Sequence, residues 1–212
     1  MTWVLHGYWR SGTSYRTRIA LNLKGVAYET APVDLRAGDQ RSAAFLALNP
    51  QGLVPALEAD GAVLTQSPAI LEWLEETRPE PPLLPSDPLA RAQVRAMAAT
   101  VACDIHPLNN LRVLQSVKHD LHADEGQMKA WPTRWIVAGF DALEAMIGLH
   151  GRGFSFGDAP TLADCCLIPQ VYSAQRFEVE LASYPRIRAV AARAAEHPAF
   201  AAAHPDRQPD AG

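Results

Sequence analysis

The chain has 212 residues, enough for one large domain or two small ones with a sizeable core. Hydrophobic residues make up 48% of it, which excludes an intrinsically disordered protein, and the formal net charge of −4 offers no general attraction to nucleic acid or an anionic membrane. The sequence shows no signal peptide and no apolar run long enough to span a bilayer, so we expect a protein without a membrane partner. The three cysteines are sparse and lack Cys-x-x-Cys spacing, which favours a reducing cytoplasm over a disulfide framework or a zinc site.

The first motif lies between a short apolar run at 3–5, which predicts a strand, and a helical pattern at 17–23. The segment 11–14, Ser-Gly-Thr-Ser, therefore occupies a strand-to-helix turn. Such a turn points unpaired backbone N–H groups at whatever precedes the helix, and the helix dipole favours negative charge there. Because Ser, Thr and Gly are also common at helix starts, ordinary capping remains an alternative interpretation.

The next elements complete a small α/β domain, which we predict to span 1–80. Gly25 ends the first helix, and Asp60-Gly61 predicts a hairpin between two short strands. Ser67 and Pro68 mark a helix start, with Ser67 as the N-cap. The remaining elements of this domain are expected at 26–33 (strand), 42–48 (helix), 56–59 and 62–65 (strands) and 67–76 (helix).

The composition changes at 79–88, where five of ten residues are proline, and this stretch predicts an extended linker. Only helical patterns follow, so we predict an all-helical second domain over 89–212, and the fold class is α/β plus all-α. The tail from His204 is polar and proline-rich and is expected to wrap loosely over the surface. The expected helices are 89–119, interrupted by Pro107; 127–149, with Pro132 as its start or a kink; 161–177, opened by a Thr161–Asp164 capping box; and 184–195.

This order of elements and several motifs resemble the cytosolic glutathione transferases, whose N-terminal domain is thioredoxin-like. More narrowly, the chain resembles their zeta class, which includes maleylacetoacetate and maleylpyruvate isomerases. One departure is that many members read Ser-Ser-Cys-Ser at 11–14, so no role of that thiol carries over to Thr13. The motifs that carry the resemblance are the segments 10–21, 53–57, 66–70, 104–111 and 169–171.

The resemblance implies glutathione as a cofactor. Ser14 is the first choice for a hydrogen bond to its sulfur, with Ser11 and Thr13 in support. Val54-Pro55 would form a cis-proline turn that pairs with the cysteinyl backbone, although an ordinary trans proline stays open. His106 would contact glutathione, or else be a capping or core histidine. The full set implied to bind glutathione is Ser11, Gly12, Thr13, Ser14, Tyr15, Arg16, Gln40, Val54, Pro55, Gln66, Ser67, His106, Asn110, Leu111 and Arg112.

The thiolate chemistry can be argued from general physics. A free thiol has a pKa near ~8.5, and lowering it by ~2 units requires about 2.7 kcal/mol in favour of the thiolate. A helix N-terminus supplies up to ~2 kcal/mol and a hydroxyl hydrogen bond to charged sulfur roughly 1.5–3 kcal/mol. Together these suffice, so no protein base is needed.

Three arginines from separate segments, Arg10, Arg112 and Arg176, are the candidate substrate ligands. Each alone is more typical of a solvated surface, but Arg holds carboxylates bidentately, and in the family model the three converge on a dicarboxylate. The implied reaction is thiolate attack on the cis double bond of a maleyl group, rotation about the resulting single bond, and elimination to the fumaryl isomer. A general transferase that conjugates electrophiles, or a non-enzymatic glutathione-binding protein, are the alternatives.

Two further features are weaker. The family implies a homodimer, and an apolar stripe on the predicted helix 89–119 would serve either as its interface or as monomer core. His119 and His122 lack a third ligand at useful spacing, so we expect no metal site. The residues of the stripe are Val94, Met97, Val101 and Ile105.

Overall fold

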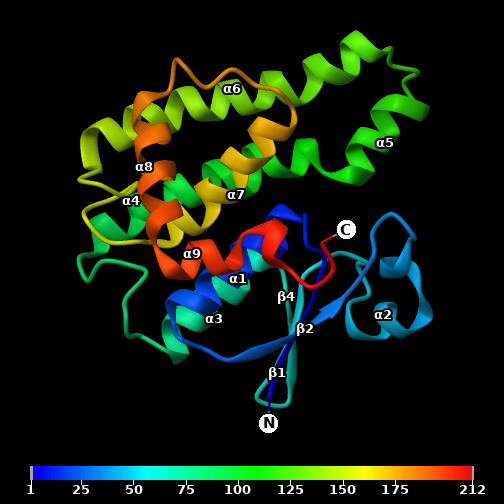
Figure 1. The fold of residues 1–212 in the computed structure, drawn as a ribbon, viewed down its shortest axis with the longest axis horizontal. Coiled ribbons are helices and arrows are strands. Elements are labelled where there is room, and N and C mark those ends of the chain that lie inside the picture. The colour runs from blue at the N-terminus through cyan, green and yellow to red at the C-terminus, as the bar shows by residue number, and fades with distance from the viewer. Residues whose placement is uncertain (1, 212) are drawn as a thin grey trace. The chain divides into compact units, whose positions relative to one another are not determined.

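The computed structural model, which describes residues 2–211, contains a four-stranded sheet in the order β2-β1-β3-β4 (Figure 1). β1 and β2 run parallel, and β3 is antiparallel to both of its neighbours. A parallel pair needs a crossover connection, which the helix α1 (Gly12–Leu23) supplies. The predicted strand positions are confirmed, with β1 at Trp3–Gly7, β2 at Tyr28–Pro32, β3 at Ala56–Ala59 and β4 at Ala62–Thr65.

The chain forms two compact units, which are described separately below. The first contains the residues up to Leu83 together with the segment from Glu196 onward, and the second contains Leu84–Ala195. The predicted domains, 1–80 and 89–212, follow the sequence patterns, whereas the contacts group the last segment with the sheet.

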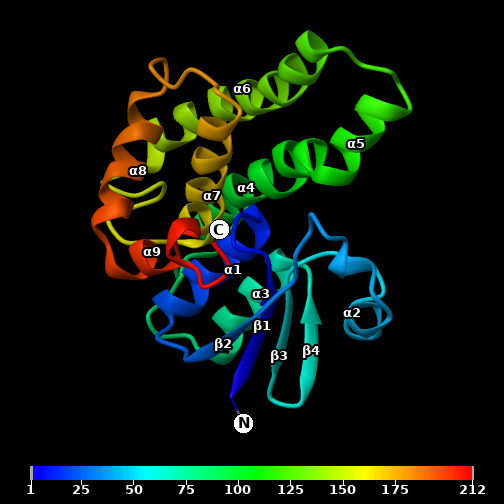
Figure 2. The same cartoon turned by 45° about the vertical axis from the view of Figure 1, so that its right-hand side comes forward.

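The core of the first unit lies between the sheet and the helices α1 and α3 (Ser67–Thr77). Leu57 of β3, Ile19 and Leu21 of α1, and Ile70 and Leu74 of α3 are completely buried. Each such side chain stabilises the fold by about 1.5–3 kcal/mol relative to leaving it exposed. Figure 2 shows β3 and β4 as a hairpin, with the short helix α2 (Ala43–Leu48) beyond the sheet.

The hairpin prediction is confirmed, since Asp60 and Gly61 both have positive φ, 50° and 82°. Gly25 likewise follows the end of α1 at φ 64°, as a glycine does after a helix C-cap. The first helix, however, begins earlier than the pattern at 17–23 indicates. Ser11 is its N-cap, so Gly12, Thr13 and Ser14 form the first helical turn.

The prediction that Ser67 caps α3 is wrong. Ser67 is already inside the helix, and the N-cap is Gln66, whose side chain makes no capping hydrogen bond. Gln66 has φ 64°, a backbone conformation that non-glycine residues adopt only at a cost. The hydroxyl of Ser67 instead accepts a hydrogen bond from Arg16, which the local sequence pattern does not reveal.

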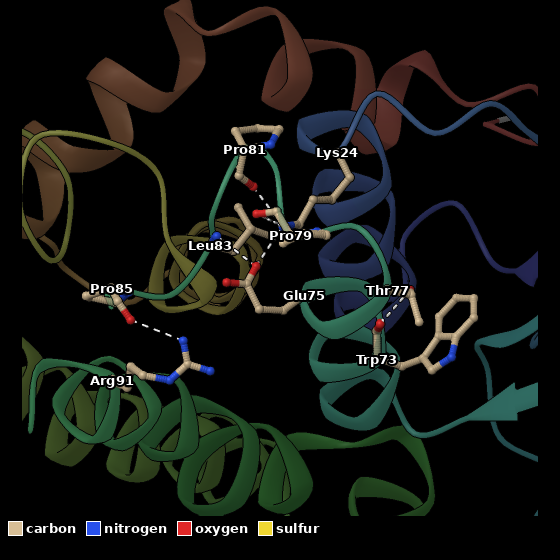
Figure 3. Close-up of polar contacts among 9 residues, drawn as sticks. All are labelled: Lys24, Trp73, Glu75, Thr77, Pro79, Pro81, Leu83, Pro85 and Arg91. Carbon is tan, nitrogen blue, oxygen red and sulfur yellow. Dashed lines mark hydrogen bonds and ion pairs between the residues drawn. The ribbon is translucent and has the colours of Figure 1, made fainter. Parts of the chain in front are cut away.

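A buried ion pair fixes the start of the proline-rich segment to the first unit (Figure 3). The ammonium of Lys24 lies 2.6 Å from a carboxylate oxygen of Glu75 and also donates to the carbonyl of Pro81 at 2.7 Å. The same oxygen of Glu75 accepts from the backbone N–H of Leu83 at 2.9 Å. Up to Asp87 the segment is neither helix nor strand, as predicted, and it is held by specific polar contacts (Figure 3).

Hydrogen bonds hold the described part of the tail, residues 204–211, so the expectation that it wraps loosely is wrong. Helix α9 (Pro198–Ala203) packs against α1, and a 3₁₀ turn, η4 (Pro205–Arg207), follows it. Gln208 donates to the carbonyls of Ala202 and His204. Asp210 accepts from the backbone N–H of Trp9, which returns the tail to the loop after β1.

The second unit is helical, as predicted (Figure 1). The expected interruption at Pro107 is confirmed, because the helix passes through a π turn and a 3₁₀ turn before it resumes after Asn110. The next helix begins at Glu125 with an Asp124–Gln127 capping box, so Pro132 is not its start. The elements are α4 (Pro88–Ala99), η2 (Thr100–Ile105), η3 (His106–Asn109), α5 (Leu111–His119), α6 (Glu125–His150), α7 (Leu162–Arg176) and α8 (Pro185–Glu196).

The structure decides two sequence predictions for this unit, the capping box at the start of α7 and the place of the apolar stripe. The Thr161–Asp164 capping box is confirmed, and Asp164 also accepts from the backbone N–H of Ser155. The apolar stripe lies in the core of the unit, where α4 packs against α7, and it is not a surface. Its four residues are at most 1% exposed: Val94, Met97, Val101 and Ile105.

Candidate glutathione site

A chain of hydroxyl groups connects the start of α1 to the turn before β3. The Oγ of Ser11 accepts from the backbone N–H of Ser14 at 3.3 Å and lies 2.9 Å from the Oγ1 of Thr13. Thr13 donates in turn to the carbonyl of Val54 at 2.9 Å. The Val54–Pro55 peptide is cis, which confirms the predicted cis-proline turn. The structure thus brings together two predicted parts of the site that are far apart in the sequence.

The three hydroxyls differ in what they can donate. Each carries one proton. Thr13 uses its proton on Val54, so Ser11 is the donor in the contact between the two hydroxyls. Ser11 is half-buried, and its proton can rotate from Thr13 toward a ligand. Ser14 has no exposed surface, and its Oγ accepts from the backbone N–H of Tyr8 at 3.3 Å. A Cβ at Gly7 would lie 3.0 Å from this Oγ, so the residue at position 7 must be small for Ser14 to pack there.

The N-terminus of α3 forms the second part of the site. No side chain caps this helix start, so its first backbone N–H groups have no side-chain acceptor and can donate to a ligand. The positive end of the helix dipole favours a negatively charged ligand there. Gln66 is exposed and donates through Nε2 to the side chain of Gln51 at 2.6 Å. Ser67 is 2% exposed, and its Oγ accepts from the Nη1 of Arg16 at 3.1 Å. The combination of an uncapped helix start, a hydroxyl and a buried guanidinium is suited to a carboxylate.

Two other residues of the first unit from the predicted set have different surroundings. Tyr15 is 3% exposed, and its ring packs edge-on against His204 with 6.0 Å between the centroids. Its side chain therefore belongs to the core. Gln40 is half-buried, and its Oε1 is enclosed without a hydrogen-bond partner among residues 2–211, which leaves an acceptor for a ligand.

The predicted residues of the second unit lie around the break between α4 and α5 and at the end of α7. His106 opens the 3₁₀ turn, Asn110 is the N-cap of α5, and Arg112 is exposed in the first turn of that helix. Leu111, the first residue of α5, is 45% exposed. Arg176 is exposed at the last position of α7, with its guanidinium beside the rings of Tyr172 and Phe177.

Arg10 belongs to the first unit, where it is half-buried with its guanidinium 5.4 Å from the ring centre of Trp9. Arg112 and Arg176 belong to the second unit. The convergence of the three arginines on one substrate remains a prediction.

Two residues that the sequence reasoning missed have buried polar groups without partners among the described residues. Tyr8 has an enclosed hydroxyl, and Asn109 has both ends of its amide enclosed. Tyr8 lies two residues before the predicted site segment 10–16, and Asn109 lies within the segment 106–112, so their position at these motifs was the available signal. Buried polar groups normally have partners, so these are additional candidates for ligand contact.

The residues present fit glutathione. The uncapped start of α3 suits its γ-glutamyl carboxylate, the turn at Val54 suits its peptide backbone, and the start of α1 suits its thiolate. No group of three or more His, Cys, Asp or Glu side chains among residues 2–211 is arranged to hold a metal ion. In the same part of the chain, no helix is both long and apolar enough to cross a membrane.

Comparison with known proteins identifies the family. The glutathione S-transferase N-terminal domain matches residues 10–77, and the corresponding C-terminal domain matches residues 122–201. A maleylpyruvate isomerase from Ralstonia sp. is 56% identical over 209 residues, which cover 97% of this chain and 98% of that protein. A maleylacetoacetate isomerase from Pseudomonas aeruginosa is 54% identical over 209 residues, with 97% of both chains covered.

Solved structures agree. The holo structure of a maleylpyruvate isomerase, described as a bacterial glutathione S-transferase of the zeta class, has a TM-score of 0.97 and 55% identity, covering 99% of this chain and 100% of that one. A maleylacetoacetate isomerase from Methylobacterium extorquens, with bound malonate and glutathione, has a TM-score of 0.93 and 43% identity, covering 99% of both chains. The chain therefore belongs to the zeta class of the glutathione transferases, with a thioredoxin-like domain followed by a helical one.

Proposed function

We propose that this protein is a glutathione-dependent isomerase that converts a maleyl keto-acid, maleylpyruvate or maleylacetoacetate, to its fumaryl isomer. Full-length relatives with these two activities support the proposal at nearly equal identity, 56% and 54%. The structural observation that carries it is the hydroxyl chain from Ser11 through Thr13 to Val54 at the start of α1. This arrangement offers a hydroxyl proton and a helix dipole to one thiolate.

Ser11 is the proposed donor to the sulfur, in place of Ser14. Its hydroxyl is partly exposed, and its proton can turn from Thr13 toward a ligand, whereas the proton of Thr13 is held by Val54 and Ser14 has no exposed surface. A charged hydrogen bond of roughly 1.5–3 kcal/mol and a helix terminus worth up to ~2 kcal/mol together stabilise the thiolate. This is enough to lower the thiol pKa by the ~2 units that reaction at neutral pH requires.

The remaining contacts follow from the geometry of the first unit. The start of α3, with Ser67 and Gln66, would hold the γ-glutamyl carboxylate, and the backbone of Val54 would pair with the cysteinyl residue. Gln40 offers an acceptor that has no partner among residues 2–211. From the second unit, the family resemblance alone assigns His106, Asn110, Leu111 and Arg112.

Bound glutathione supplies a thiolate that adds to the maleyl double bond, permits rotation about the resulting single bond and is eliminated unchanged. The chain's own contribution is to bind two carboxylates and to stabilise the negative charge that develops between them. Arg10, Arg112 and Arg176 are the proposed groups, because guanidinium forks fit carboxylates and stabilise oxyanions. The malonate in the Methylobacterium extorquens structure, a dicarboxylate, supports this class of substrate.

The proposal is tested by following isomerisation of each maleyl substrate with purified protein. We expect a rate that saturates with glutathione and disappears when S-methylglutathione, which lacks a free thiol, replaces it. Isomerisation at the same enzyme-dependent rate with S-methylglutathione would contradict the proposal. Conjugation of a neutral electrophile with no isomerisation would favour a general transferase instead.

We also propose a homodimer in the cytoplasm. The dimer rests on the family resemblance, because the stripe on α4 and η2 is monomer core. Light scattering at micromolar concentration should give about twice the chain mass, and a mass of 23.1 kDa would contradict it. The location rests on the sparse cysteines without Cys-x-x-Cys spacing, and cell fractionation tests it.

A further inference from the structure

Arg16 is a buried cation in the second turn of α1. It is 2% exposed, although it lies on the same helix as the half-buried hydroxyl turn. Its Nη1 donates to the Oγ of Ser67 at 3.1 Å, and its Nε is enclosed without a hydrogen-bond partner. Among residues 2–211, no carboxylate lies within ion-pair distance of its guanidinium.

The other buried cations of the same unit, Lys24 and Arg18, have oxygen atoms of the chain as hydrogen-bond acceptors. Lys24 has the carboxylate of Glu75 at 2.6 Å and the carbonyl of Pro81 at 2.7 Å (Figure 3). Arg18, two residues after Arg16, donates to the carbonyls of Ala203 at 3.0 Å and Trp9 at 2.8 Å. Buried charges are normally paired, because removing an ion from water is costly unless other groups replace the solvent. Arg16 is therefore an exception that calls for a negative partner from outside the chain.

The surroundings of Arg16 point to the place of that partner. Ser67 is the first residue of α3, a helix start with no side-chain cap. Because the Oγ of Ser67 accepts from Arg16, its own proton is directed to another acceptor. A hydrogen bond from a cation also polarises the hydroxyl and strengthens the bond that it donates.

We propose that Arg16 is a positioning residue for the γ-glutamyl end of glutathione. It orients and polarises Ser67, and it provides the buried positive charge that the α-carboxylate of the γ-glutamyl residue neutralises. This inference rests on the proposed function. It gives Arg16, which the family resemblance only places among the glutathione-binding residues, a specific role that acts through Ser67 from inside the domain. In the ligand-free protein the guanidinium of Arg16 therefore has no counter-charge.

Isothermal titration calorimetry with two ligands tests the proposal. The ligands are glutathione and γ-aminobutyryl-cysteinyl-glycine, which lacks only the α-carboxylate. Wild type should bind glutathione at least about tenfold more tightly than the analogue, as a charged hydrogen bond implies. Arg16→Met should lose that preference, binding both ligands about as weakly as wild type binds the analogue. Arg16→Lys, which keeps the charge but not the fork, should recover part of the preference.

The melting temperature of the ligand-free protein distinguishes this role of Arg16 from a purely structural one. Replacing an uncompensated buried cation by an apolar side chain of similar length should leave the melting temperature of Arg16→Met equal to or above that of wild type. Arg18→Met is the matched control, because it removes two hydrogen bonds to carbonyls. It should lower the melting temperature and should weaken both ligands by the same factor.

The outcomes separate the two proposals. If wild type binds neither ligand, the proposed function fails. If wild type binds glutathione but Arg16→Met weakens glutathione and the analogue equally, Arg16 does not serve the carboxylate and this inference is overturned. If Arg16→Met fails to fold, Ser67→Ala takes its place in the test. Ser67→Ala should lose the same preference for the ligand that carries the α-carboxylate. Adding Arg16→Lys to Ser67→Ala should then cause no further change in binding.

Discussion

Asp210, near the end of the chain, accepts a hydrogen bond through Oδ2 from the backbone N–H of Trp9 at 2.9 Å. Trp9 immediately precedes Arg10 and the Ser11 N-cap, so the C-terminal tail fixes the backbone that leads into the hydroxyl turn. The other oxygen of this carboxylate is enclosed without a partner in the part of the chain that the structure describes. The tail thus supports the proposed site through a contact between two residues, Trp9 and Asp210, that are 201 positions apart in the sequence.

Removing this contact should weaken both the fold and glutathione binding. We expect Asp210→Ala to lower the free energy of unfolding by about 1–3 kcal/mol, because a charged hydrogen bond is lost and the partly buried N–H of Trp9 is left unpaired. Urea unfolding and glutathione titration measure the two effects. Asp206→Ala is the control, since this tail side chain is 71% exposed and should behave as wild type. Equal behaviour of the two variants would show that the tail does not support the loop.

The second prediction concerns the sulfur. Ser11→Ala should raise the pKa of bound glutathione by about 1–2 units, because the donor to the thiolate is lost. Ser14→Ala should instead lower stability with little change in that pKa, since its hydroxyl is buried and bonded to the backbone of Tyr8. Ultraviolet titration of the bound thiolate measures both variants. A larger rise for Ser14→Ala would restore Ser14 as the donor.

The third prediction concerns Arg176, exposed at the end of α7. If it holds a substrate carboxylate, Arg176→Ala should raise KM for the maleyl substrate and reduce kcat/KM about ten- to a hundredfold, with little change in glutathione affinity. Arg176→Lys should restore only part of the loss, because an ammonium lacks the bidentate fork. Arg186→Ala, which removes an exposed ion pair with Glu144, serves as the control. Loss of glutathione binding with normal substrate kinetics would assign Arg176 to the cofactor instead.

The fourth prediction concerns Asp164, whose complete burial raises its pKa above the ordinary 3.8, against the opposing hydrogen bonds from Ser155 and Thr161. Since the folded state holds this proton more tightly than the unfolded state, the contribution of Asp164 to stability falls as the pH rises from 3.8 through the folded pKa, and is constant above it. Asp164→Asn cannot titrate, so the stability difference between wild type and this variant should shrink over that range. Urea unfolding from pH 4 to 7 measures it, and a difference that grows with pH would contradict the raised pKa.

Local sequence signals predicted the elements well but the roles of several polar residues poorly. Strands at 56–59 and 62–65, the hairpin at Asp60-Gly61 and the Thr161–Asp164 box depend on residues close in sequence, and all are confirmed. The cis turn at Val54-Pro55 came from the family resemblance and is also present. Patterns of this range suffice because turn and capping chemistry is local.

The errors share a different cause. Ser67 was predicted as a cap, but it is bonded to Arg16, 51 residues earlier. Packing of α1 against β1 buries Ser14 beside Gly7, which favours Ser11 over Ser14 as the proposed donor to the sulfur, and which hydroxyl serves the sulfur stays a prediction. The tail was predicted to be loose, but Trp9 binds it. Each outcome depends on a tertiary contact that no local pattern encodes.

The most direct test of the whole account is a turnover experiment in which product and free thiol are measured together. A catalytic amount of protein is mixed with a large excess of maleylpyruvate over glutathione, and the fumaryl product is followed by absorbance while thiol is titrated at intervals. The account predicts many molecules of fumaryl product for each glutathione present, with the thiol concentration unchanged at the end. Loss of one thiol for each substrate molecule consumed, with no fumaryl product, would contradict it.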